Sequence, residues 1–159
     1  MFFIGQIGYG GTEKQMALLL KHLNPNEFDY HIMVFNQSPF GDLKNEIEKT
    51  GAMVHFIPNN KQSIPERLLF LYKWLKDINP TTIHSWTVHD NAYAGVLGKV
   101  LGIKNIIGSV RGSIHGTGYS RMPYYLKWAS LNLVHQIVVN SRALRDELLN
   151  IGIPNKRIS

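Results

Sequence analysis

The sequence lacks cysteine entirely, although it runs to 159 residues. Disulfide bonds and thiolate metal sites are therefore excluded. Seven histidines remain as candidate metal ligands, but none stands in an HExxH motif or in another recognisable metal-binding pair. We accordingly predict that the chain holds no metal ion.

Long hydrophobic runs are also missing. No stretch reaches the about 18 uncharged apolar residues that a membrane-spanning helix needs, and the first residues, MFFIGQIG, lack the basic start of a signal peptide. With 44% apolar and 18% charged residues, the composition suits one domain with a buried core. We expect a soluble, cytoplasmic protein.

Acidic residues are scarce in the second half of the chain. Residues 1–98 contain eight lysines and arginines against nine acids, whereas residues 99–159 contain nine against two, with no acid between Asp90 and Asp146. A solvated basic face explains this pattern, and so does contact with an anionic membrane surface, a phosphorylated ligand or nucleic acid. The absence of a helix-turn-helix, zinc-finger or RNP signature argues against nucleic acid.

What the sequence does contain is a regular alternation of short β-rich runs and helical segments. Strands are predicted at residues 2–7, 30–35, 52–58, 81–86, 105–110 and 136–141, and helices at 12–23, 42–49, 65–77, 91–101, 122–133 and 141–150. This order predicts an α/β fold, a Rossmann-like, doubly wound parallel sheet in a single domain over residues 1–159. Thr12 and Ser63 are predicted helix N-caps, and Gly51, Gly102 and Gly152 lie where helix C-caps are expected.

The most distinctive short motif is GQIGYGGTEKQM at residues 5–16, which packs four glycines into seven residues before a helix begins. Amides at such a helix N-terminus favour an anion, usually phosphate. The nicotinamide-binding fingerprint fails, because Glu13 occupies its third glycine position and Asn36, rather than an acid, closes the second strand. The loop is therefore an anion site or a turn that only joins strand to helix.

Three segments resemble one known family. GYGGTEKQMALLLKHL is similar to the G-G-x-E loop and first helix in the N-terminal domain of GT-B glycosyltransferases, in particular glycosyltransferase family 4, also called group 1. TTIHSWTVHDNAYAGVLGKVLGIKNIIGSVRGS is similar to the fourth strand, helix and fifth strand of that domain, and QIVVNSRALRDELLNIGIPNKRIS to the segment that ends it. The match runs in order over nearly the whole chain.

The resemblance implies the acceptor-side domain of a retaining, hexosyltransferase-type enzyme. Such an enzyme moves a sugar from a nucleotide-sugar donor to an acceptor, here a cell-surface polysaccharide or a lipid-linked glycan, and it needs no cofactor besides that substrate. The family's C-terminal, donor-binding domain has no counterpart in the sequence, so we expect this chain alone to be inactive. We expect no nucleic-acid partner.

Candidates for donor or acceptor binding lie at the carboxyl ends of the predicted strands, where doubly wound sheets bind ligands. They are Gly10, Gly11, Thr12, His84, Trp86, Arg111 and Asn140. Strand alternation directs His84 and Trp86 to the same side of the sheet. Arg111 opens a glycine-rich segment and suits an anion clamp, whereas Asn140 and Ser141 are more typical of a helix start.

The catalytic candidates are His89 and Asp90, just after the fourth strand. Trp86 stands where the family often has a histidine, and this departure leaves His89 and Asp90 to hydrogen-bond the sugar or to place the acceptor hydroxyl. The alternative is a helix-capping Asp90 beside a packed His89.

A basic and aromatic segment, YSRMPYYLKWASLNLVHQ at residues 119–136, contains Arg121, Lys127 and Trp128 and no acid. This composition is typical of a helix that contacts an anionic membrane surface or another anion, which would make the protein peripheral at the inner face of the membrane. The alternative is a sheet-covering helix whose aromatic residues belong to the core. Two rival functions remain for the chain as a whole: a nucleotide-dependent dehydrogenase or epimerase, and a non-catalytic α/β ligand-binding domain.

Overall fold

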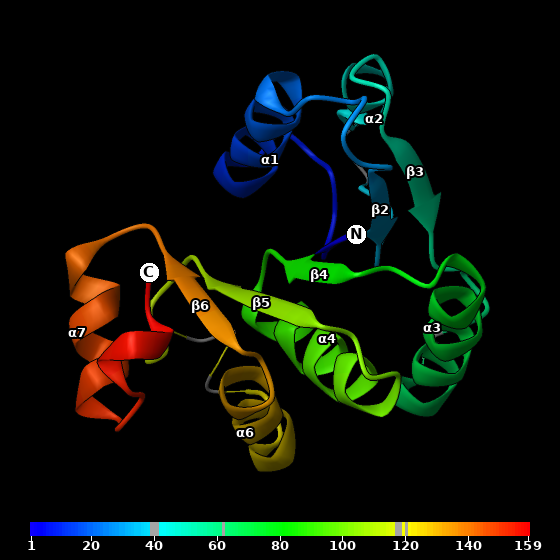
Figure 1. Ribbon diagram of the computed structural model, residues 1–159. Coiled ribbons are helices and arrows are strands. Elements are labelled where there is room, and N and C mark those ends of the chain that lie inside the picture. Colours follow the sequence, from blue (N-terminus) through cyan, green and yellow to red (C-terminus); the bar gives the residue numbers. More distant parts are fainter. Residues whose placement is uncertain (39–41, 62, 117–118, 120) are drawn as a thin grey trace.

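Six strands form one sheet in which every neighbouring pair is parallel (Figure 1). The computed structural model describes residues 1–38, 42–61, 63–116, 119 and 121–159. The strands are β1 (Phe2–Ile4), β2 (His31–Val34), β3 (Met53–Phe56), β4 (Thr82–Ser85), β5 (Asn105–Val110) and β6 (Gln136–Val139), in the spatial order β3-β2-β1-β4-β5-β6. The predicted doubly wound parallel sheet is confirmed.

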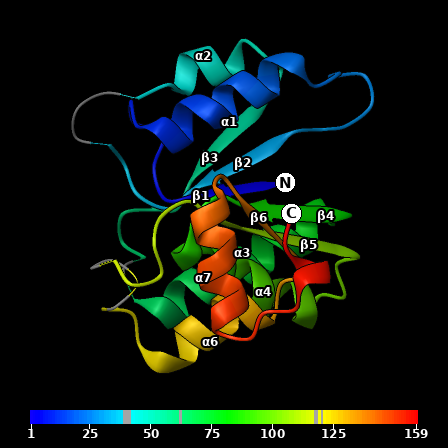
Figure 2. The same ribbon diagram turned by 90° about the vertical axis from the view of Figure 1, so that its left-hand side faces the viewer.

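Helices cover both faces of the sheet (Figure 2). One face carries α1 (Gly11–His22) and α2 (Lys44–Glu48), and the opposite face carries α3 (Ile64–Ile78), α4 (Val88–Val100) and α6 (Tyr124–Asn132). After β6 the chain forms α7 (Arg142–Asn150) and the short 3-10 helix η1 (Asn155–Arg157), and Ile158 then bridges to Ile137 of β6. This layering follows from right-handed crossovers on a sheet whose strand order reverses between β1 and β4.

Two separate hydrophobic clusters lie on the two faces. The larger one joins α3, α4, α6 and α7 to the sheet and includes Leu75, Leu97, Leu131 and Leu148. The smaller one joins α1 and α2 to β1 and β2 and extends to Trp86 just after β4, and among the described residues it includes none from β5 or β6. The α1 side of the sheet is therefore well covered only over its first strands.

Helix caps follow the sequence in part. Ser63 caps α3 with a full capping box, in which its hydroxyl accepts from the Glu66 amide, and Gly51, Gly102 and Gly152 take the predicted left-handed φ of 89°, 67° and 87°. The Thr12 cap is wrong: Gly10 is the N-cap of α1, and its carbonyl accepts the first helical bond, from the Lys14 amide.

Most element boundaries differ from the prediction by one or two residues, and two differ by three. The first strand is three residues long and ends at Ile4, where the glycine-rich loop begins. The helix predicted at 91–101 begins earlier, at Val88, because the Thr87 side chain accepts from the Asp90 amide and caps it.

Close packing of α4 against α6 depends on one glycine. A methyl group at Gly95 would lie 2.7 Å from Cβ of Leu133 and 3.3 Å from the carbonyl oxygen of Ala129. Since α6 meets α4 through such small contacts, its large aromatic side chains are directed elsewhere. Tyr124, Tyr125 and Trp128 are exposed, so the interpretation of these rings as core residues is wrong.

Candidate functional site

The loops that follow β1, β2, β4 and β5 meet at the carboxyl edge of the sheet. The strand order reverses between β1 and β4, and open α/β sheets bind their ligands in the crevice at such a reversal. The predicted site residues near the ends of β1, β4 and β5 border this position. The predicted residues of α6 and of the segment after β6 lie further out. The glycine-rich segment after Arg111 is described only in part, since residues 117, 118 and 120 lie outside the described residues.

The glycine loop seats a carboxylate against the start of α1. A methyl group at Gly10 would lie 2.3 Å from Oε2 of Glu13, whereas one at Gly11 would meet nothing within 4 Å. Glu13 is only 8% exposed and complements the positive end of the helix. An anion at the amides of Gly11 and Thr12 would thus share this helix end with Glu13. The G-G-x-E spacing places the Glu13 carboxylate against position 10, where a side chain larger than that of glycine would collide with it.

An aromatic and cationic stack stands at the ends of β4 and β5. The rings of His84 and Trp86 stack with centroids 5.2 Å apart, which confirms that both point to one side of the sheet. The guanidinium carbon of Arg111 lies 4.6 Å from the centroid of the Trp86 ring, a cation–π distance. Nη1 of Arg111 donates to Oε1 of Gln15 on α1 at 2.6 Å.

Two buried donors of this stack are left unpaired. Nε1 of Trp86 and Nε of Arg111 are buried and have no hydrogen-bond partner among the described residues. Buried polar groups are nearly always paired, and an unmade bond costs about 1–3 kcal/mol. Both groups are donors, so the chemistry that would satisfy them is an acceptor oxygen such as that of a phosphate or a sugar.

His84 is held neutral beside the arginine. Burial, the Arg111 cation and the N-terminal ammonium together lower the pKa of His84 to about 4. Its Nε2 lies 3.0 Å from Oγ of Ser109 on β5. A neutral imidazole in this position contributes packing and one hydrogen bond rather than positive charge, so Arg111 supplies the cation of this stack.

The two catalytic candidates have contrasting surroundings. Asp90 is 2% exposed, and Oγ1 of Thr87 donates to its Oδ2 at 2.7 Å. Burial raises the pKa of Asp90 to about 7, against the hydrogen bond from Thr87, the Arg67 cation and the backbone of Gly5. His89 is exposed, which overturns the packed alternative, and its pKa is lowered by partial burial. The N-cap of α4 is Thr87 rather than Asp90, which lies in the first turn and hydrogen-bonds the cap through its carboxylate.

Sequence reasoning missed Arg67 and Gln15. Arg67 lies on α3, where its Nη2 donates to Oδ1 of Asn36 at 3.1 Å and its Nε donates to the Lys61 carbonyl at 3.2 Å. Asn36 in turn donates to the carbonyl of Gly5 at 3.2 Å. A search restricted to strand ends could not find residues that helices bring to the edge, and no local motif marks either of them.

Asn91, also missed, ties the site's strands together. Its Oδ1 accepts from the Ser85 hydroxyl at 2.5 Å and from the Ser109 amide at 3.1 Å, while its Nδ2 donates to the Ser109 carbonyl at 3.0 Å. The residue is fully buried. The one side chain therefore links β4, α4 and β5 just before the strands release Trp86 and Arg111.

The remaining candidates lie apart from this stack. Asn140 is exposed after β6, and Ser141 caps α7 by accepting from the Leu144 amide. Arg121, Lys127 and Trp128 belong to or precede α6, which lies on the far side of the sheet from α1 (Figure 2). The segment after Arg111 is anchored, because Oε2 of Glu147 on α7 accepts from the Ser113 hydroxyl and the Ile114 amide, both at 3.0 Å.

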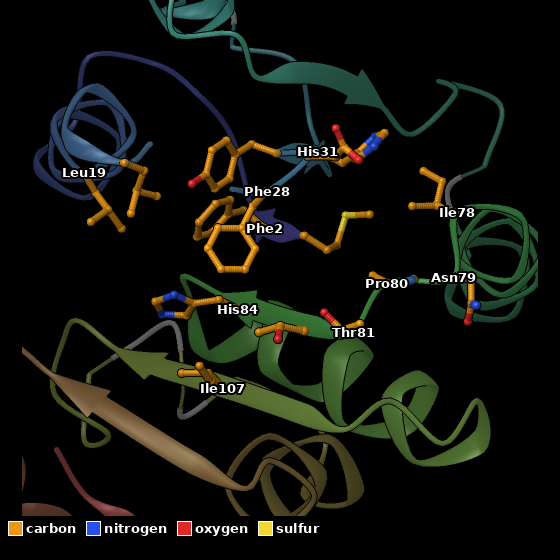
Figure 3. Close-up of a pocket in the computed structure, with 15 residues that line it drawn as sticks. Phe2, Leu19, Phe28, His31, Ile78, Asn79, Pro80, Thr81, His84 and Ile107 are labelled. Carbon is orange, nitrogen blue, oxygen red and sulfur yellow. The ribbon is translucent and has the colours of Figure 1, made fainter. Parts of the chain in front are cut away.

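A cavity of about 490 Å³ lies at the opposite, amino edge of the sheet (Figure 3). It is lined chiefly by apolar and aromatic side chains, including Phe2, Leu19, Phe28 and Ile78, with His31 and His84 among its polar groups. The cavity opens where the α1-side cluster leaves the sheet uncovered. His84 in its wall stacks on Trp86, but neither Trp86 nor Arg111 lines the cavity, so we place the candidate site at the carboxyl edge.

Comparisons with known proteins agree with this architecture. The family model of Glycosyltransferase Family 4 matches residues 9–159. No curated protein gives a significant sequence match. Among the described helices, none is both long and apolar enough to cross a membrane.

Several solved structures share the fold. They include the lipopolysaccharide outer core galactosyltransferase WaaB in its apo form, with a TM-score of 0.71 and 19% identity, and Anabaena Alr3699/HepE in complex with UDP and glucose, with 0.69 and 14%. The UDP-GlcNAc 2-epimerase from Methanocaldococcus jannaschii follows with 0.60 and 14%. The matches cover 99%, 99% and 100% of this chain but 44%, 42% and 45% of those chains. The chain thus spans less than half the length of these proteins.

Proposed function

Because the chain belongs to Glycosyltransferase Family 4, we propose that it is the acceptor-side, N-terminal domain of a retaining, hexosyltransferase-type enzyme of the cytoplasm. This enzyme transfers a sugar from a nucleotide-sugar donor to a growing cell-surface polysaccharide or a lipid-linked glycan. The observation that carries the site is the pair of buried donors on Trp86 and Arg111 that have no partner among the described residues. They lie at the carboxyl edge, where the fold binds ligands.

The donor proposal is a nucleotide sugar held through its diphosphate. Anabaena Alr3699/HepE, which shares the fold, is solved with UDP-glucose, and this makes a uridine nucleotide sugar the first donor to test. In this chain Arg111 and the amides of Gly11 and Thr12 would grip phosphate oxygens. Because Glu13 shares the helix end and no base pocket is evident among the described residues, we expect this chain alone to bind nucleotides only at about millimolar concentration.

The chemistry proposal divides the roles of His89 and Asp90. In the transfer, an acceptor hydroxyl oxygen bonds to the anomeric carbon as the nucleotide leaves, and the hydroxyl proton must be taken up. His89 is exposed and is proposed to orient that hydroxyl. Asp90 has a pKa of about 7, so it can hold or release a proton near neutral pH, and its contacts to Thr87 and Gly5 place it beside the glycine loop.

The proposal is tested by the indole N–H signal of Trp86 in the ¹⁵N NMR spectrum of the chain. The signal is assigned by its loss in Trp86→Phe and followed during titration with pyrophosphate, UDP and UDP-glucose. We expect it to shift with half-saturation at about millimolar ligand, and Arg111→Lys to weaken binding about tenfold through loss of one charged hydrogen bond. Arg142→Lys, on exposed α7, is the matched control and should leave the titration unchanged.

Three outcomes would contradict this assignment. A Trp86 signal that none of the phosphates moves would remove the site, and sugar transfer by the 159-residue chain alone would overturn the half-enzyme architecture. Micromolar binding of NAD would favour the dehydrogenase. The epimerase, supported by the likeness to a UDP-GlcNAc 2-epimerase, is tested with a longer protein that carries this chain: conversion of UDP-GlcNAc without an acceptor would favour it over transfer.

A further inference from the structure

The outer face of α6 is aromatic. Tyr124, Tyr125 and Trp128 are 82%, 61% and 51% exposed, and their spacing of one and four residues places them on one side of the helix. The buried residues of the same helix are Ala129, Ser130 and Leu131. We call Tyr124, Tyr125 and Trp128 the α6 aromatic face.

Cations accompany this face. Arg121 is exposed and stands three residues before Tyr124, the first residue of the helix, and Nζ of Lys127 lies 5.4 Å from the ring centroid of Tyr119. The sequence has no acidic residue from position 91 to position 145. The segment that carries the rings therefore presents positive charge without negative charge of its own, which selects an anionic partner.

The position of α6 leaves this face open. The helix lies at the outer surface on the side of the sheet opposite α1 and α2 (Figure 2), and it packs inward on α4 through Gly95, Ala129 and Leu133. It begins at Tyr124, shortly after the segment that Arg111 opens at the carboxyl edge. Twelve residues of sequence separate Arg111 from the first residue of α6.

We propose that the α6 aromatic face, with Arg121 and Lys127, binds the surface of an anionic lipid bilayer. Tyrosine and tryptophan carry an apolar ring and a polar tip, a combination that favours the boundary between headgroups and acyl chains. Lysine and arginine add attraction to anionic headgroups. The helix has nine residues and would lie along the surface. This binding does not depend on the sugar transfer.

The test is co-sedimentation of the 159-residue chain with vesicles. One set is phosphatidylcholine alone, and the other is equal parts phosphatidylcholine and phosphatidylglycerol, each at low and high salt. We expect binding to the anionic vesicles at low salt, and its loss at about 1 M salt, where screening acts within about 3 Å. Arg121→Ala and Lys127→Ala should each weaken binding about fivefold, from about 1 kcal/mol per cation. The exposed lysines of α3 provide the control, Lys73→Ala/Lys76→Ala, which should retain binding.

The aromatic part has its own readout. Tyr124→Ser/Tyr125→Ser/Trp128→Ser should weaken binding at least about tenfold, because burying roughly 60 Å² of ring surface already corresponds to that factor. Trp128→Phe should keep binding but remove most of the tryptophan fluorescence shift that vesicles cause, since Trp86 is buried and Trp74 is half-buried against His31 and His55. Circular dichroism checks that each variant is folded.

The proposal is overturned if folded chain fails to sediment with anionic vesicles, if neutral vesicles bind equally well at both salt concentrations, or if the serine variant binds as tightly as the parent. Concentration-dependent dimers that the serine variant abolishes, without vesicle binding, would identify the face as a protein contact instead. None of these results bears on the phosphate titration of Trp86, so the two proposals fail separately.

Discussion

The two edges of the sheet differ in what they offer a ligand. The amino edge has a hollow of about 490 Å³ with mainly apolar walls. The carboxyl edge has the polar groups: donors on Trp86 and Arg111 that are buried and unpaired within the described part of the chain, and a buried carboxylate on Asp90. His84, which lines the hollow and stacks on Trp86, lies between the two.

The physical origin of each edge explains the difference. The hollow exists because the cluster under α1 and α2 reaches only to Trp86 and leaves β5 uncovered on that side. The polar edge exists because parallel strands release their loops together at one end. A search guided by cavity volume alone would therefore choose the amino edge rather than the edge at which we propose that phosphate or sugar binds.

The largest expected effect concerns Asp90 and pH. A carboxyl group whose pKa rises on folding keeps its proton longer in the folded protein, so stability falls as the pH rises from the ordinary aspartate pKa of 3.8 toward about 7. Asp90→Asn should remove this loss, and the free energy of unfolding of the variant should gain on the parent by about 4 kcal/mol between about pH 3.5 and pH 8. Urea unfolding at several pH values measures it.

Asp90→Asn also weakens the cap to Thr87, but that loss is nearly independent of pH, so the slope rather than the absolute stability is diagnostic. The exposed carboxylate of Asp146 on α7 provides the control, Asp146→Asn. If the free energies of unfolding of the parent and of Asp90→Asn change with pH in parallel, Asp90 titrates as an ordinary surface acid. The carboxyl edge would then not be distinguished by a buried carboxyl group of raised pKa.

The next effect concerns Asn91, which ties the carboxyl edge together. Asn91→Leu should lower the free energy of unfolding by about 3 kcal/mol, because three buried hydrogen bonds vanish and leave polar groups of Ser85 and Ser109 unpaired. Asn150→Leu, at the exposed end of α7, should change it by less than about 0.5 kcal/mol. Equal effects of the two substitutions in urea denaturation would contradict the anchoring role of Asn91.

A smaller effect is expected beside the amino-edge cavity. Nδ1 of His31 and Nε2 of His55 lie 3.2 Å apart, and Trp74 covers both rings. Burial lowers the pKa of both histidines; the N-terminal ammonium lowers that of His31 further while Asp29 opposes this, and His31 lowers that of His55. Such groups bind fewer protons when folded, so stability falls as the pH drops below about 6.5.

His55→Gln should make the protein less sensitive to acid between about pH 7 and pH 5, by at most about 1 kcal/mol because both rings are only half-buried. His22→Gln, at the exposed end of α1, serves as the matched control in the same urea titrations. If His55→Gln loses as much stability on acidification as the parent, the pair does not set the acid response of this edge.

The sequence predicted the architecture because its signals are local. The alternation of β-rich and helical segments predicts the order of strands and helices. The cap at Ser63 and the left-handed glycines 51, 102 and 152 mark helix ends, and each depends on neighbouring residues only. Arg67, Gln15 and Asn91 reach the site from helices, and only tertiary packing brings them there. The cap at Gly10 was missed because the prediction looked for a capping hydroxyl and chose Thr12. The helix instead begins with the bond from the Lys14 amide to the Gly10 carbonyl, which needs no side chain.

The smallest effect separates the two glycines of the carboxyl-edge loop. Gly10 has a φ of −72°, which any residue adopts, so the only obstacle to a side chain is Oε2 of Glu13, 2.3 Å from the added methyl group. Gly10→Ala should lower the free energy of unfolding by about 0.5–1 kcal/mol, as the carboxylate is displaced from the helix end and a favourable cap residue is lost. Gly11→Ala, inside the helix and in open space, should raise it by about the same amount.

A double-mutant cycle decides whether Glu13 is the cause. In a Glu13→Ala background the displaced carboxylate no longer exists, so Gly10→Ala should cost only the few tenths of a kcal/mol that separate glycine from alanine at the cap. If the cost is the same in both backgrounds, the G-G-x-E spacing does not serve to seat Glu13, and the amides of Gly11 and Thr12 are open to a phosphate without competition. Stronger pyrophosphate binding by Glu13→Ala, followed at the Trp86 indole signal, would show that the carboxylate and the ligand compete for one helix end.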